Sequence, residues 1–209
     1  MIHGAPPSSD LAGHKQIYEK VKLALETCQE SQAVEFTESQ PWQDLRWKIT
    51  RTSMAMGNLR DGGIIVVGIS QRRQKWSLGG MRKVDLQTFD VDIINSQVNE
   101  YVSPHVDLTI VLHRRENKSY VVVAAKEFDH TPLVCKKSRE SEGLYQGAVY
   151  IRPPGKAQTT RMMNAQEMHG LLELAAEKRS RQFLERAARL GLFRPGASSQ
   201  QFDQELKGL

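Results

Sequence analysis

Hydrophobic and polar residues follow two different periods along this chain. Helical spacing of apolar residues predicts four helices, at residues 14–27, 41–58, 85–101 and 164–192. Short apolar or alternating runs predict strands at residues 33–36, 64–69, 106–112, 120–125 and 148–152, with a further extended segment at residues 131–135. A hairpin turn is expected at residues 117–119. This order predicts one α+β (mixed α/β) domain, with a central mixed sheet flanked by helices.

The run at residues 64–69 is apolar at every position. Such a strand is covered on both faces and is therefore expected at the centre of its sheet. Gly62 and Gly63 lead into the run, Gly68 lies within it, and Asn58 ends the preceding helix, so we expect these four residues to shape the surrounding turns. The glycines precede the strand and no GxxxxGK[ST] motif occurs, which excludes an ordinary phosphate-binding loop.

In the third predicted helix, one side is expected to face the core and carries four apolar residues: Phe89, Ile93, Ile94 and Val98. The fourth predicted helix is long, with an apolar and a basic side. It could dock on a partner protein or on a second copy of the chain.

The composition narrows the class of protein. Of the 209 residues, 39% are hydrophobic and 25% are charged, which is typical of a globular protein. The longest apolar run is strand-sized, so no membrane partner is expected, and no secretory signal is visible. Cys28 and Cys135 lie far apart, which excludes a disulfide framework and a zinc site built on cysteine pairs. We therefore expect a reducing, cytoplasmic setting.

The net charge of +5 is concentrated in one part of the chain. Residues 1–60 carry 7 basic and 7 acidic residues, and residues 61–130 carry 9 of each. Residues 131–209 carry 13 basic and 8 acidic residues, which accounts for the whole excess. An anionic partner should therefore meet this last third or loops folded beside it; the alternative is a solvated basic face on a surface helix.

Several predicted loops combine basic residues with an aromatic neighbour. Arg72, Arg73 and Lys75 follow the central strand and precede Trp76, while Lys136 and Lys137 follow the extended segment at residues 131–135. Such loops suit a phosphate backbone and an unstacked base. With the two basic residues beside Pro153-Pro154-Gly155, the candidate nucleic-acid contacts are Arg72, Arg73, Lys75, Lys136, Lys137, Arg152 and Lys156.

Glu30 and Glu35 form a second candidate site. They flank a predicted helix-to-strand junction, where two carboxylates could meet at one point. Clustered carboxylates can hold a divalent cation for phosphodiester hydrolysis, although two glutamates at this spacing can equally be exposed surface residues. The histidines show no metal-ligand spacing, and no GxSxG motif occurs.

The run ESQAVEF at residues 30–36 resembles the opening of the Schlafen AlbA-type domain, which typically reads E-S-x-x-x-E-F-K. The likeness continues in AMGN at residues 55–58, in DGG at 61–63 with the apolar strand after it, and in GAVYIR at 147–152. It covers residues 14–175. Residues 1–13 are then a flexible N-terminal segment, and residues 176–209 are the C-terminal helix and a loose tail.

This resemblance implies nucleic-acid binding, and family members are also labelled divergent ATP-binding domains. Some vertebrate relatives cleave tRNA and rRNA with three acidic residues, in a basic cleft between two lobes. Glu30 and Glu35 correspond to the first two of these residues. The third normally follows the apolar strand, where this sequence has Ser70 and Gln71. Two carboxylates without the third hold a metal poorly, and nearby arginines repel a cation.

We therefore expect a nucleic-acid-binding protein, RNA or DNA, and the sequence identifies no cofactor for it. A homodimer or a larger complex is expected, because a lone lobe needs a partner to form a two-lobed cleft. One alternative is an endoribonuclease that holds Mg²⁺ or Mn²⁺ with Glu30 and Glu35. The other is a protein-interaction or regulatory subunit, for example in antiviral defence.

Overall fold

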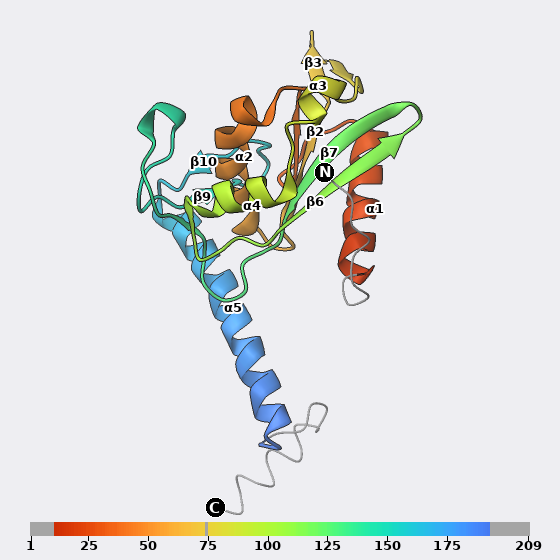
Figure 1. The fold of residues 1–209 in the computed structure, drawn as a ribbon. Helices are drawn as coiled ribbons and strands as arrows, with labels where there is room; N and C mark the ends of the chain where they lie inside the picture. Colours follow the sequence, from red (N-terminus) through yellow and green to blue (C-terminus); the bar gives the residue numbers. More distant parts are fainter. Residues whose placement is uncertain (1–10, 74, 193–209) are drawn as a thin grey trace, which may run out of the picture.

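The computed structural model of this chain describes residues 11–73 and 75–192 (Figure 1). Most of the segment predicted to be flexible, residues 1–13, lies outside this range. Its last three residues are helical instead, because α1 begins at Leu11. The predicted loose tail lies outside the described residues from position 193 onward.

The core of the fold is a four-stranded mixed sheet in the order β1-β2-β7-β6. Strand β1 (Val34–Thr37) runs parallel to β2 (Gly63–Val67), while β7 (Lys118–Ala125) and β6 (Leu108–Arg115) continue the sheet in antiparallel pairs. All five residues of β2 are buried, and β2 lies between two partners. The central strand predicted from its apolar sequence is therefore confirmed.

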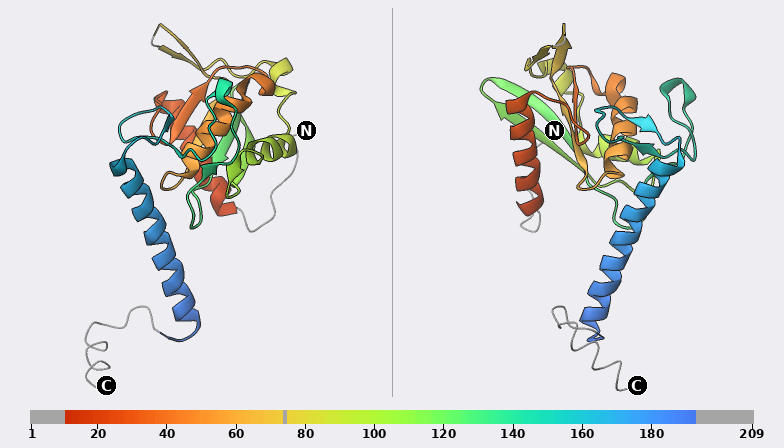
Figure 2. Two further views of the ribbon diagram at one scale, coloured as in Figure 1. Left: turned by 90° about the vertical axis from the view of Figure 1, so that its left-hand side faces the viewer. Right: turned by 180° about the vertical axis from the view of Figure 1, so that it is seen from behind.

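Helices cover both faces of this sheet (Figures 1 and 2). Helix α1 (Leu11–Thr27) packs its buried residues against Ile64 and Val66. Helices α2 (Trp42–Gly57) and α4 (Val91–Asn99) pack on the opposite face with Ile65 and Val67. Alternate β2 residues thus point to opposite apolar layers, as the two-residue period of a strand requires.

The prediction of a single helix at residues 85–101 is wrong in one respect. The structure has two helices there, α3 (Lys83–Leu86) and α4. Asp90 adopts an extended backbone and its side chain accepts from the amides of Asp92 and Ile93, so it caps a new helix. Phe89, Ile94 and Val98 are buried as expected, but Ile93 is 48% exposed.

The turn between β6 and β7 lies one residue earlier than predicted. Arg115 pairs with Lys118, so only Glu116 and Asn117 form the turn, and Glu116 has a positive φ of 55°. The predicted strand at 148–152 is shorter, and is β9 (Tyr150–Ile151), paired with β10 (Thr160–Arg161). The remaining short elements are β3 (Ser70–Arg72), β4 (Lys75–Ser77), β5 (Val102–Ser103), β8 (Val134–Cys135) and the 3-10 turn η1 (Glu140–Glu142).

The long helix α5 (Ala165–Arg189) projects away from the rest of the protein (Figures 1 and 2). Asn164 caps its first turn by accepting from the amide of Glu167. Leu171 and Leu174 pack on the body, and Glu177 forms an ion pair with Arg60. The domain boundary predicted after residue 175 falls inside this continuous helix. No helix in the described part of the chain is long and apolar enough to cross a membrane.

Candidate nucleic-acid interface

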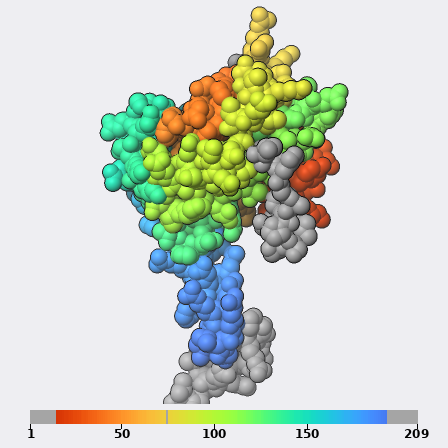
Figure 3. Space-filling model, in the orientation of Figure 1, coloured from red at the N-terminus to blue at the C-terminus, as the bar shows by residue number. Residues whose placement is uncertain are grey.

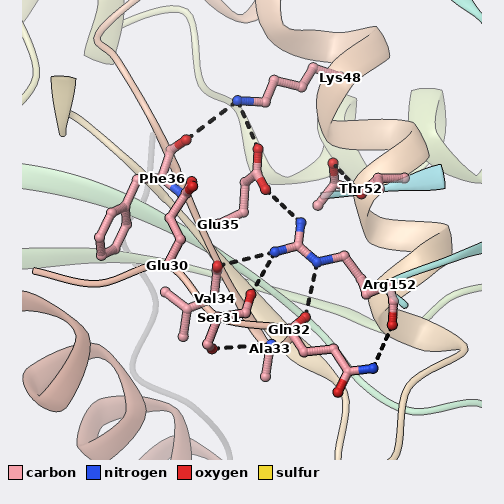
Figure 4. A network of polar contacts seen from close by, with 11 residues as sticks. Glu30, Ser31, Gln32, Ala33, Val34, Glu35, Phe36, Lys48, Thr52 and Arg152 are labelled. Atoms are coloured by element: carbon pink, nitrogen blue, oxygen red, sulfur yellow. Dashed lines mark hydrogen bonds and ion pairs between the residues drawn. The ribbon is translucent and has the colours of Figure 1, made fainter. Parts of the chain in front are cut away.

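Arg152, which directly follows β9, is buried rather than exposed. Its guanidinium donates to the backbone carbonyls of Gln32 (3.0 Å), Ser31 (2.7 Å) and Val34 (3.2 Å), and it forms an ion pair with the Glu35 carboxylate (Figure 4). The side chain has no exposed surface. The expectation that Arg152 contacts phosphate is therefore corrected. Its donors instead connect the end of β9 to the segment that leads into β1.

Glu35 lies on β1 and uses both carboxylate oxygens. One oxygen binds Arg152, and the other lies 2.9 Å from Lys48 Nζ on α2, which also donates to the Phe36 carbonyl (Figure 4). The Glu35 side chain is only 12% exposed. Two cations thus offset the single negative charge of this carboxylate.

Glu30 precedes β1, and its carboxylate accepts from the amide of Phe36 at 2.8 Å. Burial raises the pKa of the Glu30 carboxyl above its ordinary value; the Phe36 amide offsets part of this rise, and the nearby Glu35 carboxylate adds to it. The two carboxylates proposed from the sequence are therefore neighbours in the fold.

A shallow cavity of about 410 Å³ joins Glu30 and Glu35 to Ser70 and Gln71, the positions at which the resemblance led us to look for a third acid. Lys48 lines the same cavity. Within the described residues, no three histidine, cysteine or acidic side chains are grouped to hold a metal ion. With Glu35 already neutralised and a lysine present, these donors do not fit Mg²⁺ or Mn²⁺.

The basic residues after the central strand lie on a hairpin that the sequence analysis did not predict. Strands β3 and β4 pair in antiparallel register, with Arg72 opposite Lys75, and Arg73 in the turn has a positive φ of 47°. All three side chains are exposed, and no described residue forms an ion pair with them. The Trp76 ring packs edge-on against Phe36, 5.1 Å between centroids, and anchors the hairpin beside the cavity.

The other predicted basic residues lie in loops near β8 and β9. Lys136 and Lys137 are exposed directly after β8, and Lys156 is exposed in the turn after Pro153. Lys137 Nζ lies 2.8 Å from Glu100, and this hydrogen bond lowers the pKa of the Glu100 carboxyl. The loop after β8 and the β3–β4 hairpin lie at the same end of the body, away from the projecting end of α5 (Figure 1).

A group of three residues at this end was missed as a unit by the sequence analysis. The guanidinium carbons of Arg46 and Arg139 lie 4.1 and 4.4 Å from the ring centroid of Trp47. Arg46 and Trp47 belong to α2, whereas Arg139 comes from the loop after β8. The available signals were an Arg-Trp-Lys run between the apolar positions 45 and 49 of α2 and the place of Arg139 in the basic loop that begins with Lys136 and Lys137.

The turn residues lie around the start and end of β2. Asn58 is buried, and its side chain accepts from the Leu133 amide and donates to the carbonyls of Leu133 and Tyr150. Gly62 has a positive φ of 62°, and a Cβ there would lie 2.1 Å from the Ala125 carbonyl oxygen. Gly63 begins β2, and Gly68, with a φ of 112°, packs against Gly80. A side chain at Gly62 would therefore force the backbone of β2 away from β7.

Comparison with known proteins places this fold in a family. The family described as "Schlafen, AlbA_2" matches residues 30–161. The structure is similar to that of the DIP2311 protein from Corynebacterium diphtheriae, with 15% identity and a TM-score of 0.51, over 76% of this chain and 28% of the other. This chain thus spans little more than a quarter of that protein's resolved length.

A weaker similarity links the chain to the N-terminal domain of an ATP-dependent DNA helicase RecG-related protein from Nitrosomonas europaea. That comparison gives 18% identity and a TM-score of 0.43, over 69% of this chain and 94% of the other. No curated protein matches the sequence. Because the family match spans more than half of the 209 residues, the protein belongs to the Schlafen AlbA_2 family.

Proposed function

We propose that this protein binds nucleic acid through basic side chains at the end of the body that carries the β3–β4 hairpin and the loop after β8. The observation that carries this proposal is the hairpin itself. Arg72 and Lys75 are exposed on paired strands, Arg73 is exposed in the turn that joins them, and no described carboxylate neutralises the three. Unpaired cations on one hairpin can contact successive phosphates. Membership of the Schlafen AlbA_2 family supports the same function.

The acidic cavity favours binding over strand cleavage. Glu35 is committed to Arg152 and Lys48, and neutral side chains stand at positions 70 and 71. In this arrangement Glu35 positions β1 and its neighbours instead of holding a metal. The proposed function therefore rests on the phosphate backbone and needs no divalent cation.

The proposal predicts a steep dependence of affinity on salt. Fluorescence anisotropy with fluorescein-labelled 20-nucleotide single strands and 20-base-pair duplexes, of RNA and of DNA, would measure the binding constant. The logarithm of the association constant should fall linearly with the logarithm of salt concentration. Each phosphate contact should steepen this slope by about 0.7 on a single strand and by about 0.9 on duplex DNA. An affinity that stays constant between about 50 and 200 mM salt would contradict the proposal.

We infer that the exposed side of α5 is covered by a second copy of the chain. Ala176 and Phe183 on the helix and Leu190, the C-cap residue directly after it, are spaced by seven residues, and the two large side chains are 70% and 75% exposed. Leu171 and Leu174, by contrast, contact the body of the protein. These positions supply one apolar residue per heptad, where a two-stranded coiled coil uses two, so the contact we propose is a short packing of two identical helices and not a coiled coil.

This inference predicts a mass twice the 23.7 kDa of the monomer in sedimentation or light scattering. The substitution Phe183→Glu should give monomers, because the new carboxylate places a charge between the two helices. The control Gln182→Glu adds the same charge, but its position is turned by about 100° around the helix. A monomeric wild-type protein, or a Phe183→Glu variant that remains dimeric, would rule out this contact.

A further inference from the structure

Arg46 and Arg139 are brought to one indole ring from segments 93 positions apart in the sequence. The first arginine lies beside Trp47 on α2, and the second directly precedes η1. Their guanidinium carbons lie 4.1 and 4.4 Å from the Trp47 ring centroid. At this separation the aromatic face attracts each cation and limits the directions in which its donors can point. We call these three residues the Trp47 cluster.

Two further contacts hold the Trp47 cluster in place. The Trp47 ring packs edge-on against Tyr101, with 5.2 Å between centroids. The backbone of Arg139 exchanges two hydrogen bonds with Leu144, which closes the loop that carries it. In the space-filling view, this loop, in teal, forms a prominence beside the orange α2 (Figure 3). Arg139 is exposed and Arg46 is half-buried, and both are held by ordered segments.

Neither arginine of the Trp47 cluster has an acidic partner among the residues that the structure describes. No hydrogen bond joins either guanidinium to those residues, and Arg46 Nε is buried without an acceptor. Stacking occupies the flat faces of a guanidinium and leaves its in-plane N–H groups able to bind an anion. Two like charges held against one ring also repel each other, and an anion that contacts both would relieve this repulsion.

The positive charge at this point is that of the two arginines themselves. The Glu100 carboxylate interacts electrostatically with Arg46, but its ion-pair partner is Lys137. The exposed Lys136 adds a further positive charge, and two glutamates of η1 are the nearest acids in sequence to Arg139. The other charges on these elements balance: Arg51, Lys136 and Lys137 stand against Glu100, Glu140 and Glu142.

We propose that Arg46 and Arg139, stacked on Trp47, form a binding site for backbone phosphates of a nucleic-acid strand. This inference rests on the proposed function and adds a second point of contact to it, on α2 and the loop after β8. Two guanidinium groups lie over the indole ring, and their N–H groups bind phosphate. Recognition at this point is therefore independent of base identity.

Two variants separate the charge of the site from its geometry. Arg46→Gln with Arg139→Gln removes two donors, and should weaken binding of a labelled 20-nucleotide single strand about tenfold or more and lower the salt slope by about 1.4. Trp47→Leu keeps both charges but removes their support, and should weaken binding about threefold to tenfold with little change in slope. The matched control Lys15→Gln with Lys22→Gln removes two exposed charges from α1 and should bind like wild type.

The outcomes distinguish this inference from the proposed function. If the double arginine variant binds RNA and DNA like wild type while an Arg72→Gln, Arg73→Gln variant loses affinity, the Trp47 site is overturned and the proposed function stands. If the wild-type protein shows no salt-dependent binding, both fail. Arg139→Gln alone, in an exposed loop, should keep the native circular dichroism spectrum and still lower the salt slope by about 0.7; an unchanged slope would overturn the site.

Discussion

Replacement of Arg152 by alanine should lower the free energy of unfolding by about 3–5 kcal/mol, the cost of removing one partner from a buried ion pair. The variant leaves Glu35 buried with Lys48 alone, and the carbonyls of Ser31, Gln32 and Val34 lose their donor. Urea denaturation followed by tryptophan fluorescence would measure the change. A loss below about 1 kcal/mol would contradict the structural role of Arg152.

Two controls make this measurement specific. Arg114→Ala removes an exposed arginine that has no described partner, and should change stability by less than about 0.5 kcal/mol. The double variant Arg152→Ala with Glu35→Ala should lose less stability than the sum of the two single variants, because the second change removes the carboxylate left unpaired by the first. Strict additivity would show that the two side chains do not stabilise each other.

Replacing Arg72, Arg73 and Lys75 by glutamine should weaken binding to a single strand about 100-fold at about 100 mM salt and lower the salt slope by about 2, if each side chain contacts one phosphate. The hairpin should keep its place because Trp76 remains packed on Phe36. Fluorescence anisotropy over a series of salt concentrations would give both quantities, and thermal unfolding would confirm that the variant is folded.

The control for the hairpin carries the same change in net charge. Lys15, Lys22 and Arg189 are exposed on α1 and α5, and their replacement by glutamine also removes three positive charges. We expect this control to keep most of the wild-type affinity, since general attraction to a polyanion depends on net charge but close phosphate contact depends on position. Equal losses in both triple variants would show that the hairpin is not a contact site.

The elements with an unambiguous pattern could be predicted from the sequence. The apolar run at residues 64–69 identified the central strand because each of its side chains is covered. The meeting of Glu30 and Glu35 followed from their places on either side of one short junction. These features depend on local spacing, which the sequence displays directly.

The features that were not predicted depend on contacts between distant segments. Nothing in the sequence around Arg152 shows that its side chain would be buried and paired with Glu35, which lies 117 positions earlier. The stacking of Arg46 and Arg139 on Trp47 likewise needs α2 and the loop after β8 to meet. The polar β3–β4 hairpin has no buried face to produce an apolar pattern, and a side-chain cap at Asp90 divided the third helix.

The span of the Arg152 contacts has a consequence for the order in which the polypeptide folds. Hydrogen bonds between Arg152 and Gln32 cross 120 positions of the chain. During synthesis, the segment that leads into β1 therefore cannot form its contacts with Arg152 until residue 152 has left the ribosome. Until then the emerging chain holds the Glu35 carboxylate without its arginine. Contacts of such long range slow the last step of folding and favour completion after most of the domain has been made.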